Sequence, residues 1–261
     1  MDLDLSGRHA LVCGASEGIG AAAARELALL GADVTVLARR EHALADVVAS
    51  LHAQDGQAHG ALAVDMDDSA GLAAAVADLV ARKPVHILVN NTAGPPGGAA
   101  SEAEDDAYLA TFRRHLIGGQ TLLRAVLPGM REAGYGRLVN VISTSVKEPI
   151  PNLGVSNTVR GAVAAWAKTL ATELAPHGIT VNNVLPGFTE TGRLAGLIKA
   201  NAEKAGTSED AIARGMLATV PAGRFARAEE TAAAIAFLCS PAAAFINGVN
   251  LPVDGGRTKS L

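Results

Sequence analysis

The sequence has 261 residues, of which 49% are hydrophobic and 18% charged, and this composition fits a compact globular protein and excludes a disordered chain. The formal net charge of −4 at pH 7 argues against a nucleic-acid-binding protein, which usually carries a basic face. No apolar stretch approaches the ~20 residues that span a bilayer, and the N-terminal residues lack the basic-then-apolar order of a secretory signal.

Short apolar runs alternate with alanine-rich helical stretches along the whole chain. Strands are predicted at 10–13, 34–38, 61–64, 86–89, 137–142, 180–185 and 248–253. Helices are predicted at 18–30, 41–51, 69–82, 105–131, 156–175 and 229–239. The strands are continuously apolar, as in a parallel sheet covered on both faces. Right-handed crossovers then give an α/β fold, a Rossmann-type doubly wound sheet whose ligand binds beyond the carboxyl ends of the strands.

The segment from about 188 to 216 lacks strand character and interrupts this alternation. We interpret it as a helical lid over the ligand site, as such insertions often are. No linker, repeat or low-complexity block divides the chain, so we expect a single dinucleotide-binding domain over 1–261. Cys13 and Cys239 are far apart and lack the spacing of metal ligands, which predicts free thiols, no metal site and a cytoplasmic protein.

A glycine-rich turn, CGASEGIG, follows the first predicted strand. Gly14 permits the tight turn, Gly18 lets the backbone approach a pyrophosphate, and Gly20 allows close packing of helix on strand. The following helix would direct its free amides and positive dipole end at the phosphates. Three such glycines can also form a turn without a ligand, but the strand before them and the helix after them favour dinucleotide binding.

The second predicted strand ends at Ala38, where an NAD site would place an acidic residue for the adenosine ribose. Arg39 and Arg40 follow instead. An arginine pair can hold a 2′-phosphate and stack on adenine, which favours NADP(H), with NAD(H) as the alternative cofactor. Glu17 counts against NADP(H), because it puts negative charge where a basic residue would help. The other interpretation of the arginine pair is a solvated start of a helix.

Further motifs resemble the short-chain dehydrogenase/reductase family over nearly the whole chain, and its 3-oxoacyl-carrier-protein reductases most closely. Val64-Asp65 is similar to the family's adenine-contacting pair. The run NNTAG at 90–94 resembles its Asn-Asn-Ala-Gly element, with Thr92 as an apparent extra residue. Pro186-Gly187 with the threonines that follow resembles the loop that holds the nicotinamide carboxamide. The run from 220 to 256 resembles the C-terminal signature.

The resemblance implies a nicotinamide cofactor and a set of residues that contact it. These are Gly14, Ser16, Glu17, Gly18, Ile19, Gly20, Arg39, Arg40, Asp65, Met66, Asn91, Ala93, Gly94, Arg160, Pro186, Gly187, Thr189 and Thr191.

The resemblance also implies a catalytic Ser, Tyr and Lys, with a helical Asn that helps to hold a proton-relay water. Ser143, after the fifth predicted strand, matches the serine. Thirteen residues later the chain has Ser156 and Arg160 where Tyr-x-x-x-Lys is expected, and His115 replaces the Asn. We take these four residues as candidate catalytic residues, although the family mechanism cannot be transferred to them directly.

The sequence does not determine which group in this catalytic set donates the proton. A serine hydroxyl at 156 is much less acidic than a tyrosine and reaches less far. Arg160 lies one helical turn away and can hydrogen-bond a nicotinamide ribose, but it cannot pass on a proton. His115 has a reference pKa of ~6.5, which suits a proton donor at neutral pH. The alternative interpretation, given equal weight, is a histidine packed in the core or in an interface. Lys147, Glu148, a bound water or a hydroxyl of the substrate are further candidates.

The favoured function is an NADP(H)-dependent oxidoreductase, a ketoreductase that acts on a small carbonyl or hydroxyl compound with a non-standard proton donor. A non-redox isomerase, dehydratase or cyclase on the same scaffold is one alternative, and an inactive binding or partner protein is another. Family members often assemble through the helices corresponding to 105–131 and 156–175. The small residues from Gly161 to Ala171 suit close helix packing, so we expect a homotetramer or homodimer.

The substrate leaves little trace in the sequence. Basic residues of the lid, Arg193 among them, could meet an acidic carrier or thioester ligand. Since they alternate with acidic residues, the pattern is more typical of a solvated helix surface.

Overall fold

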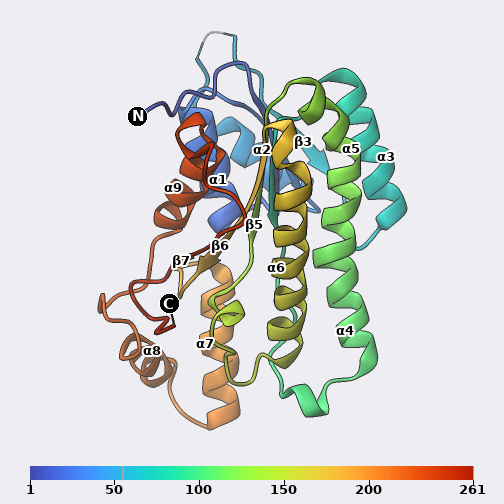
Figure 1. Cartoon of the computed structure of the whole chain (residues 1–261). Coiled ribbons are helices and arrows are strands. Elements are labelled where there is room, and N and C mark those ends of the chain that lie inside the picture. Colours follow the sequence, from blue (N-terminus) through green and yellow to red (C-terminus); the bar gives the residue numbers. More distant parts are fainter. Residues whose placement is uncertain (55, 261) are drawn as a thin grey trace.

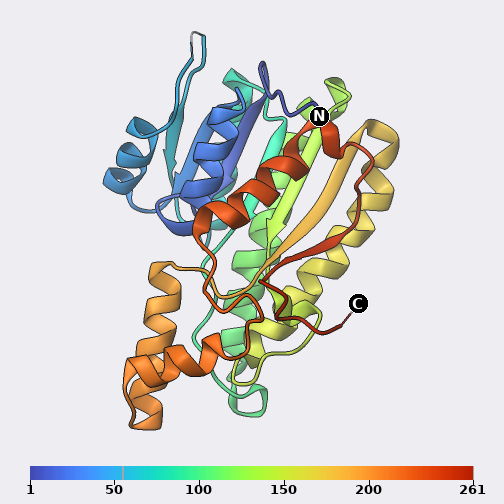
Figure 2. The same cartoon turned by 90° about the vertical axis from the view of Figure 1, so that its left-hand side faces the viewer.

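The computed structural model of the protein describes residues 1–54 and 56–260. Over this part of the chain, parallel strands form one sheet in the order β3-β2-β1-β4-β5-β6-β7, with helices on both faces (Figure 1; Figure 2). The strands are β1 (His9–Cys13), β2 (Asp33–Ala38), β3 (Gly60–Ala63), β4 (Ile87–Asn91), β5 (Gly136–Val141), β6 (Ile179–Pro186) and β7 (Asn250–Val253). The helices are α1 (Gly18–Leu29), α2 (Glu41–Ala49), α3 (Ser69–Arg82), α4 (Asp105–Phe112), α5 (Gly118–Glu132), α6 (Gly154–Leu174), α7 (Gly192–Ala205), α8 (Glu209–Leu217) and α9 (Ala228–Cys239). The predicted α/β doubly wound fold is confirmed.

Strand β1 shows how the sequence builds two layers around the sheet. Successive side chains of a strand point to opposite faces, so Ala10 and Val12 join the apolar core under α1, α2 and α9. Leu11 and Cys13 join the core under α3, α5 and α6. Because both faces are covered, both sets of side chains are apolar, which explains the continuous apolar runs. Cys13 and Cys239 are buried free thiols, and burial raises the pKa of each to about 12.

The topology creates a crevice at the carboxyl ends of β1 and β4. From β1 the chain continues to β2 and β3 on one side, whereas β4 pairs with the other edge of β1 and leads to β5, β6 and β7. The two crossovers therefore leave the sheet in opposite directions, and ligands of doubly wound folds bind at this point. Here the turn at Gly14 meets the end of β4, where the Asn91 side-chain amide donates to the Gly14 carbonyl oxygen at 3.2 Å.

The helix predicted near 105–131 is not continuous. It is divided into α4 and α5 by a π-helical turn over Arg113–Ile117. Such a turn inserts an extra residue into the helical hydrogen-bond pattern and is frequent at functional sites. In this protein the π turn carries His115, whose side chain is buried.

The segment predicted to interrupt the strand–helix alternation contains α7 and α8, which project beyond the carboxyl edge of the sheet (Figure 2). Within residues 1–54 and 56–260, no helix is both long enough and apolar enough to cross a membrane.

Candidate active site

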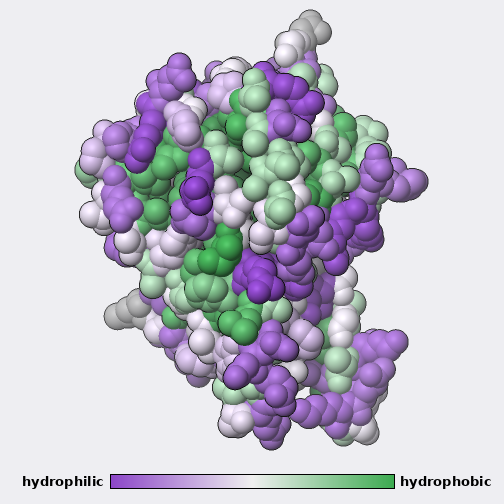
Figure 3. Space-filling model, turned by 90° about the vertical axis from the view of Figure 1, so that its right-hand side faces the viewer, coloured by the Kyte–Doolittle hydropathy of each residue, from purple (hydrophilic) through white to green (hydrophobic). Residues whose placement is uncertain are grey.

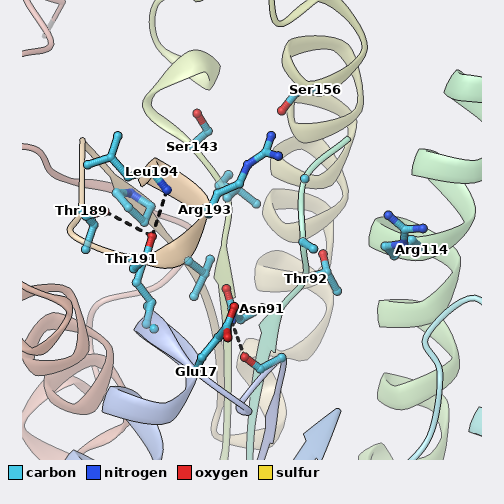
Figure 4. Close-up of a pocket in the computed structure, with 18 of the residues that line it drawn as sticks. Glu17, Asn91, Thr92, Arg114, Ser143, Ser156, Thr189, Thr191, Arg193 and Leu194 are labelled. Atoms are coloured by element: carbon cyan, nitrogen blue, oxygen red, sulfur yellow. Dashed lines mark hydrogen bonds between the residues drawn. The ribbon is translucent and has the colours of Figure 1, made fainter. Parts of the chain in front are cut away.

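A cavity of about 560 Å³ lies at the carboxyl edge of the sheet, between the strand ends and α7 (Figure 4). It brings together nearly all of the site residues expected from the sequence. They are Gly14, Ser16, Glu17, Gly18, Ile19, Arg39, Arg40, Asp65, Met66, Asn91, Ala93, Gly94, Ser143, Ser156, Arg160, Pro186, Gly187, Thr189 and Thr191. Gly20 and His115 lie outside this lining.

The glycine turn forms a tightly packed cradle at one end of the cavity. Gly14 and Gly18 both have φ +58°, a conformation that favours glycine. A Cβ at Gly14 would lie 2.3 Å from the Asn91 carbonyl oxygen, and one at Gly20 would lie 2.3 Å from the Gly14 carbonyl oxygen. Glu17, the N-cap of α1, makes no side-chain capping bond. The first amides of α1 therefore remain available to an anion such as a pyrophosphate.

The carboxylates of the lining all lie near this cradle and all pair with arginines. Glu17 binds the Arg40 guanidinium at 2.7 Å. Asp65 lies 3.8 Å from Arg39, and Asp67 is hydrogen-bonded to Arg114. The Arg114 bond holds the pKa of the Asp67 carboxyl below its ordinary value. The charges at this end of the cavity are thus matched before any ligand binds.

Two serines stand at the other end, where β5 ends and α6 begins. The Ser143 Oγ accepts a hydrogen bond from the Ser145 amide at 3.1 Å. The Ser156 Oγ accepts one from the Arg160 Nε at 3.3 Å. Because each serine oxygen already accepts from the protein, each hydroxyl proton can be donated to a group in the cavity. Each serine is therefore suited to donate a hydrogen bond to a ligand oxygen in the cavity.

Arg160 is a buried cation, with 8% of its surface exposed. Its Nη1 donates to the Val141 carbonyl oxygen at 3.1 Å. Burial, and secondarily the nearby Arg193, lower the pKa of Arg160 to about 10. The guanidinium therefore stays charged at neutral pH.

His115 lies behind the main cavity. Its Nδ1 contacts the Oγ1 of Thr92, and Thr92 lines the cavity. Its Nε2 is buried without a hydrogen-bond partner among the described residues and borders a separate space of about 10 Å³ beside Asn90. Burial, followed by the charges of Arg160 and Arg114, lowers the pKa of His115 to about 3. The imidazole is neutral at physiological pH, and it lies outside the cavity lining that contains the two serines.

The two tyrosines of the sequence, and the charged candidates Lys147 and Glu148, lie outside the cavity lining. Tyr108 donates to the Ala100 carbonyl oxygen at 3.3 Å, and Tyr135 donates to a backbone carbonyl of α9 at 2.6 Å. Glu148 accepts bonds from backbone amides near the C-terminus.

Sequence reasoning missed Arg193 as a site residue. The sequence predicts a place on the solvated surface of the lid, and Arg193 is exposed, but it also lines the cavity from the first turn of α7. Its Nη2 donates to the Pro95 carbonyl oxygen at 2.8 Å. The signal in the sequence is its position two residues after Thr191, directly after the loop predicted to hold the nicotinamide carboxamide.

The fold and this cavity define an NAD(P)-dependent oxidoreductase of the Rossmann type. Residues 14–258 match the family described as "Enoyl-(Acyl carrier protein) reductase". The chain belongs to the short-chain dehydrogenase/reductase family.

Relatives of this chain match it over nearly their whole length. The chain is 34% identical to the 3-oxoacyl-acyl-carrier-protein reductase FabG of Escherichia coli, over 97% of this chain and 98% of FabG. It is 32% identical to the NADPH-dependent reductase BacG of Bacillus subtilis, over 98% and 100%. The solved L-sorbose reductase of Gluconobacter frateurii, complexed with NADPH and L-sorbose, superposes with a TM-score of 0.92 at 30% identity, with 100% of both chains covered.

Proposed function

We propose that this protein is an NADPH-dependent ketoreductase that reduces the carbonyl group of a small molecule to an alcohol. The main observation behind this proposal is that Ser143 and Ser156 line the same cavity as the glycine cradle. Each of these serines has a hydroxyl proton to donate. The relatives support this proposal, since BacG is named as NADPH-dependent and the sorbose reductase binds NADPH together with a ketose.

The residues of the cradle fit a dinucleotide. The glycine turn and the uncapped amides of α1 would hold the pyrophosphate. Arg39 and Arg40 would hold the 2′-phosphate, since Arg40 offsets the charge of Glu17 and the Arg39 side chain is 70% exposed at the cavity mouth. Asp65 and Met66 would contact the adenine.

The remaining predicted contacts lie toward the serines. Asn91, Ala93 and Gly94 would flank the nicotinamide ribose, and Arg160 would bind its hydroxyls. The loop after β6 would hold the carboxamide through Pro186, Gly187, Thr189 and Thr191. NAD(H) is the alternative cofactor, and a comparison of the two dissociation constants distinguishes them.

When bound, the cofactor supplies a hydride to the carbonyl carbon. Ser143 and Ser156 hold the carbonyl oxygen by hydrogen bonds that strengthen as negative charge develops there. Ser156 then passes its hydroxyl proton to this oxygen, a transfer between two alcohol oxygens of similar basicity. The Arg160 Nε bond stabilises the serine oxygen left behind, and water from the cavity returns the proton. The reaction consumes one hydride and one proton from solvent, and no tyrosine is required.

Stoichiometric oxidation of NADPH with a panel of ketones, and identification of the alcohol by mass spectrometry, tests this function. Product formed without NADPH oxidation would instead support a non-redox isomerase, dehydratase or cyclase. Cofactor binding with no turnover of any substrate would support a binding or partner protein.

We also propose that α7 and α8 form a lid and that the protein is a homodimer or homotetramer. The lid role is supported by Thr191, Leu194 and Leu197, which line the cavity from α7 and its N-cap. The assembly is supported by exposed apolar side chains on α4 and the π turn, on the side of the molecule seen in Figure 3. These are Leu109, Phe112 and Ile117. Light scattering tests the assembly by comparing the wild type with a variant that has charged residues at Leu109 and Phe112. The variant should have a lower molar mass than the wild type, and a monomeric wild type would contradict the proposal.

A further inference from the structure

The cavity lining holds more arginines than carboxylates. Its arginines are Arg39, Arg40, Arg114, Arg160, Arg193 and Arg257, and its carboxylates are Glu17, Asp65 and Asp67. Each carboxylate pairs with one of the first three arginines. Within residues 1–54 and 56–260, no carboxylate lies within 4.0 Å of the other three. A concave site with uncompensated positive charge, in a protein of net charge −4, indicates an anionic ligand.

Two of these unpaired cations converge on one point. A Cβ at Gly94 would lie 3.4 Å from the Arg160 Nη2 and 3.5 Å from the Arg193 Nη2. Like charges this close repel each other, and Arg193 contributes to the lowered pKa of Arg160. Arg160 is anchored by bonds to Val141 and Ser156, whereas Arg193 has a single bond to the Pro95 carbonyl oxygen. An anion that pairs with Arg193, in the bidentate geometry that arginine favours, would reduce this repulsion.

The direction of Arg193 separates it from the pyrophosphate cradle. Figure 4 shows its side chain pointing toward Ser143 and Ser156 and away from Glu17. The pyrophosphate cradle, in contrast, already has its own groups for binding phosphate: the backbone amides at the start of α1, and Arg39 and Arg40 beside them. The unmatched charge therefore lies where the carbonyl substrate would react.

We propose that the substrate is a keto acid, whose carboxylate pairs with Arg193 while its keto oxygen is held by Ser143 and Ser156. This inference rests on the proposed ketoreductase function and adds the substrate class to it. Arg193 then acts as a specificity-determining residue: it orients the carbonyl carbon for hydride transfer by fixing the opposite end of the molecule.

The first experiment compares acids with their uncharged esters. Benzoylformate and acetoacetate are assayed beside their methyl esters with NADPH, using the wild type, R193M, R193K and the control K199Q. Lys199 is exposed on the same helix and lies outside the cavity lining. The wild type should prefer at least one acid over its ester. R193M should lose roughly 50-fold in kcat/KM for that acid, the size expected for a lost charged pair, and change little for the ester. R193K should recover part of the loss, and K199Q should behave as the wild type.

Equal use of acid and ester by the wild type, or an equal loss on both in R193M, would overturn the keto-acid assignment. A rise in the NADPH dissociation constant of R193M, with no change of acid preference, would assign Arg193 to the cofactor and also overturn it.

The second experiment measures binding without turnover. Oxalate, an unreactive dicarboxylate, is titrated by calorimetry into the protein saturated with NADP⁺. Binding to the wild type and a tenfold or greater loss in R193M are expected, whereas equal affinity in both contradicts the anion site. If oxalate binding depends on Arg193 but no ketone consumes NADPH, the anion site stands and the ketoreductase function fails. If esters are reduced and oxalate does not bind, the ketoreductase function stands and the anion site fails.

Discussion

The two ends of the cavity differ in how their charges are balanced. At the glycine cradle, Glu17 and Asp67 are paired with arginines, so the protein itself neutralises its charges. At the serine end, Arg160 and Arg193 face the cavity with no carboxylate within 4.0 Å among the described residues. We expect the first end to accept the cofactor by exchanging its exposed ion pairs for bonds to the ligand. The second end has no carboxylate of its own to pair with its arginines. A negatively charged substrate would supply one.

This difference also bears on the proposed proton donor, Ser156. A buried cation next to Ser156 favours any state in which the serine oxygen gains negative charge. The same field disfavours a second cation, and it contributes to keeping His115 neutral. Positive charge at the serine end therefore supports a hydroxyl donor and opposes an imidazolium donor.

The largest expected effect comes from breaking the serine end. S143A and S156A should each lower kcat by roughly 100- to 1,000-fold, as for loss of a donor to a developing oxyanion. The dissociation constant of NADPH, measured by fluorescence titration, should stay within a few-fold of the wild type. A loss of NADPH affinity that matches the loss of rate would show that the serines act on cofactor binding instead.

An acid titration of stability sharpens the description of the region behind the serines. The pKa of His115 is about 3 in the folded protein and ~6.5 when unfolded, so the unfolded chain binds more protons between these values. His115 should therefore lower the free energy of unfolding as pH falls below ~6.5, by about 2 kcal/mol between pH 7.5 and 5. The free energy of unfolding of H115Q, measured in urea, should not show this part of the decrease at low pH.

The histidines near the opposite end of the sheet serve as the reference for that measurement. Burial also lowers the pKa of His9 and His86, so the H115Q protein should remain partly acid-sensitive. Identical pH dependence in H115Q and the wild type would mean that the imidazole is charged or solvated in the folded protein.

Breaking the cradle end tests the choice of cofactor. Removing both arginines in R39A/R40A should reduce the preference for NADPH over NADH by about 10- to 100-fold, because charge-assisted bonds to the 2′-phosphate are lost. Reduction rates with saturating NADPH should be nearly unchanged. An unaltered ratio of the two dissociation constants would contradict the assignment of these arginines to the 2′-phosphate.

The smallest expected effect has the opposite sign. In E17Q, Arg40 no longer has a carboxylate partner, so NADPH should bind a few-fold more tightly while NADH binding stays constant. The exposed pair is worth little by itself, and the salt dependence of NADPH affinity should increase. Weaker NADPH binding in E17Q would indicate that Glu17 positions Arg40 rather than competing for it.

Local patterns in the sequence determined the fold and most of the cofactor cavity. The helix predicted at 69–82 coincides with α3 (Ser69–Arg82), since the strand–helix rhythm depends on residues close together in the chain. The glycines at 14, 18 and 20 and the serine after β5 could be placed for the same reason: the turn or strand end that needs them is specified by their immediate neighbours.

Tertiary structure alone decided the charges and directions of the side chains in the site. The π turn was invisible because side-chain periodicity does not report a shift in backbone hydrogen bonding. His115 could be assigned a neutral ring only once its burial was known. Arg193 looked like part of a solvated helix, and its place in the cavity depends on a contact with Pro95, 98 residues away in the chain. Burial and ion pairing arise between distant segments, so they follow from the packing of the fold and not from any stretch of sequence.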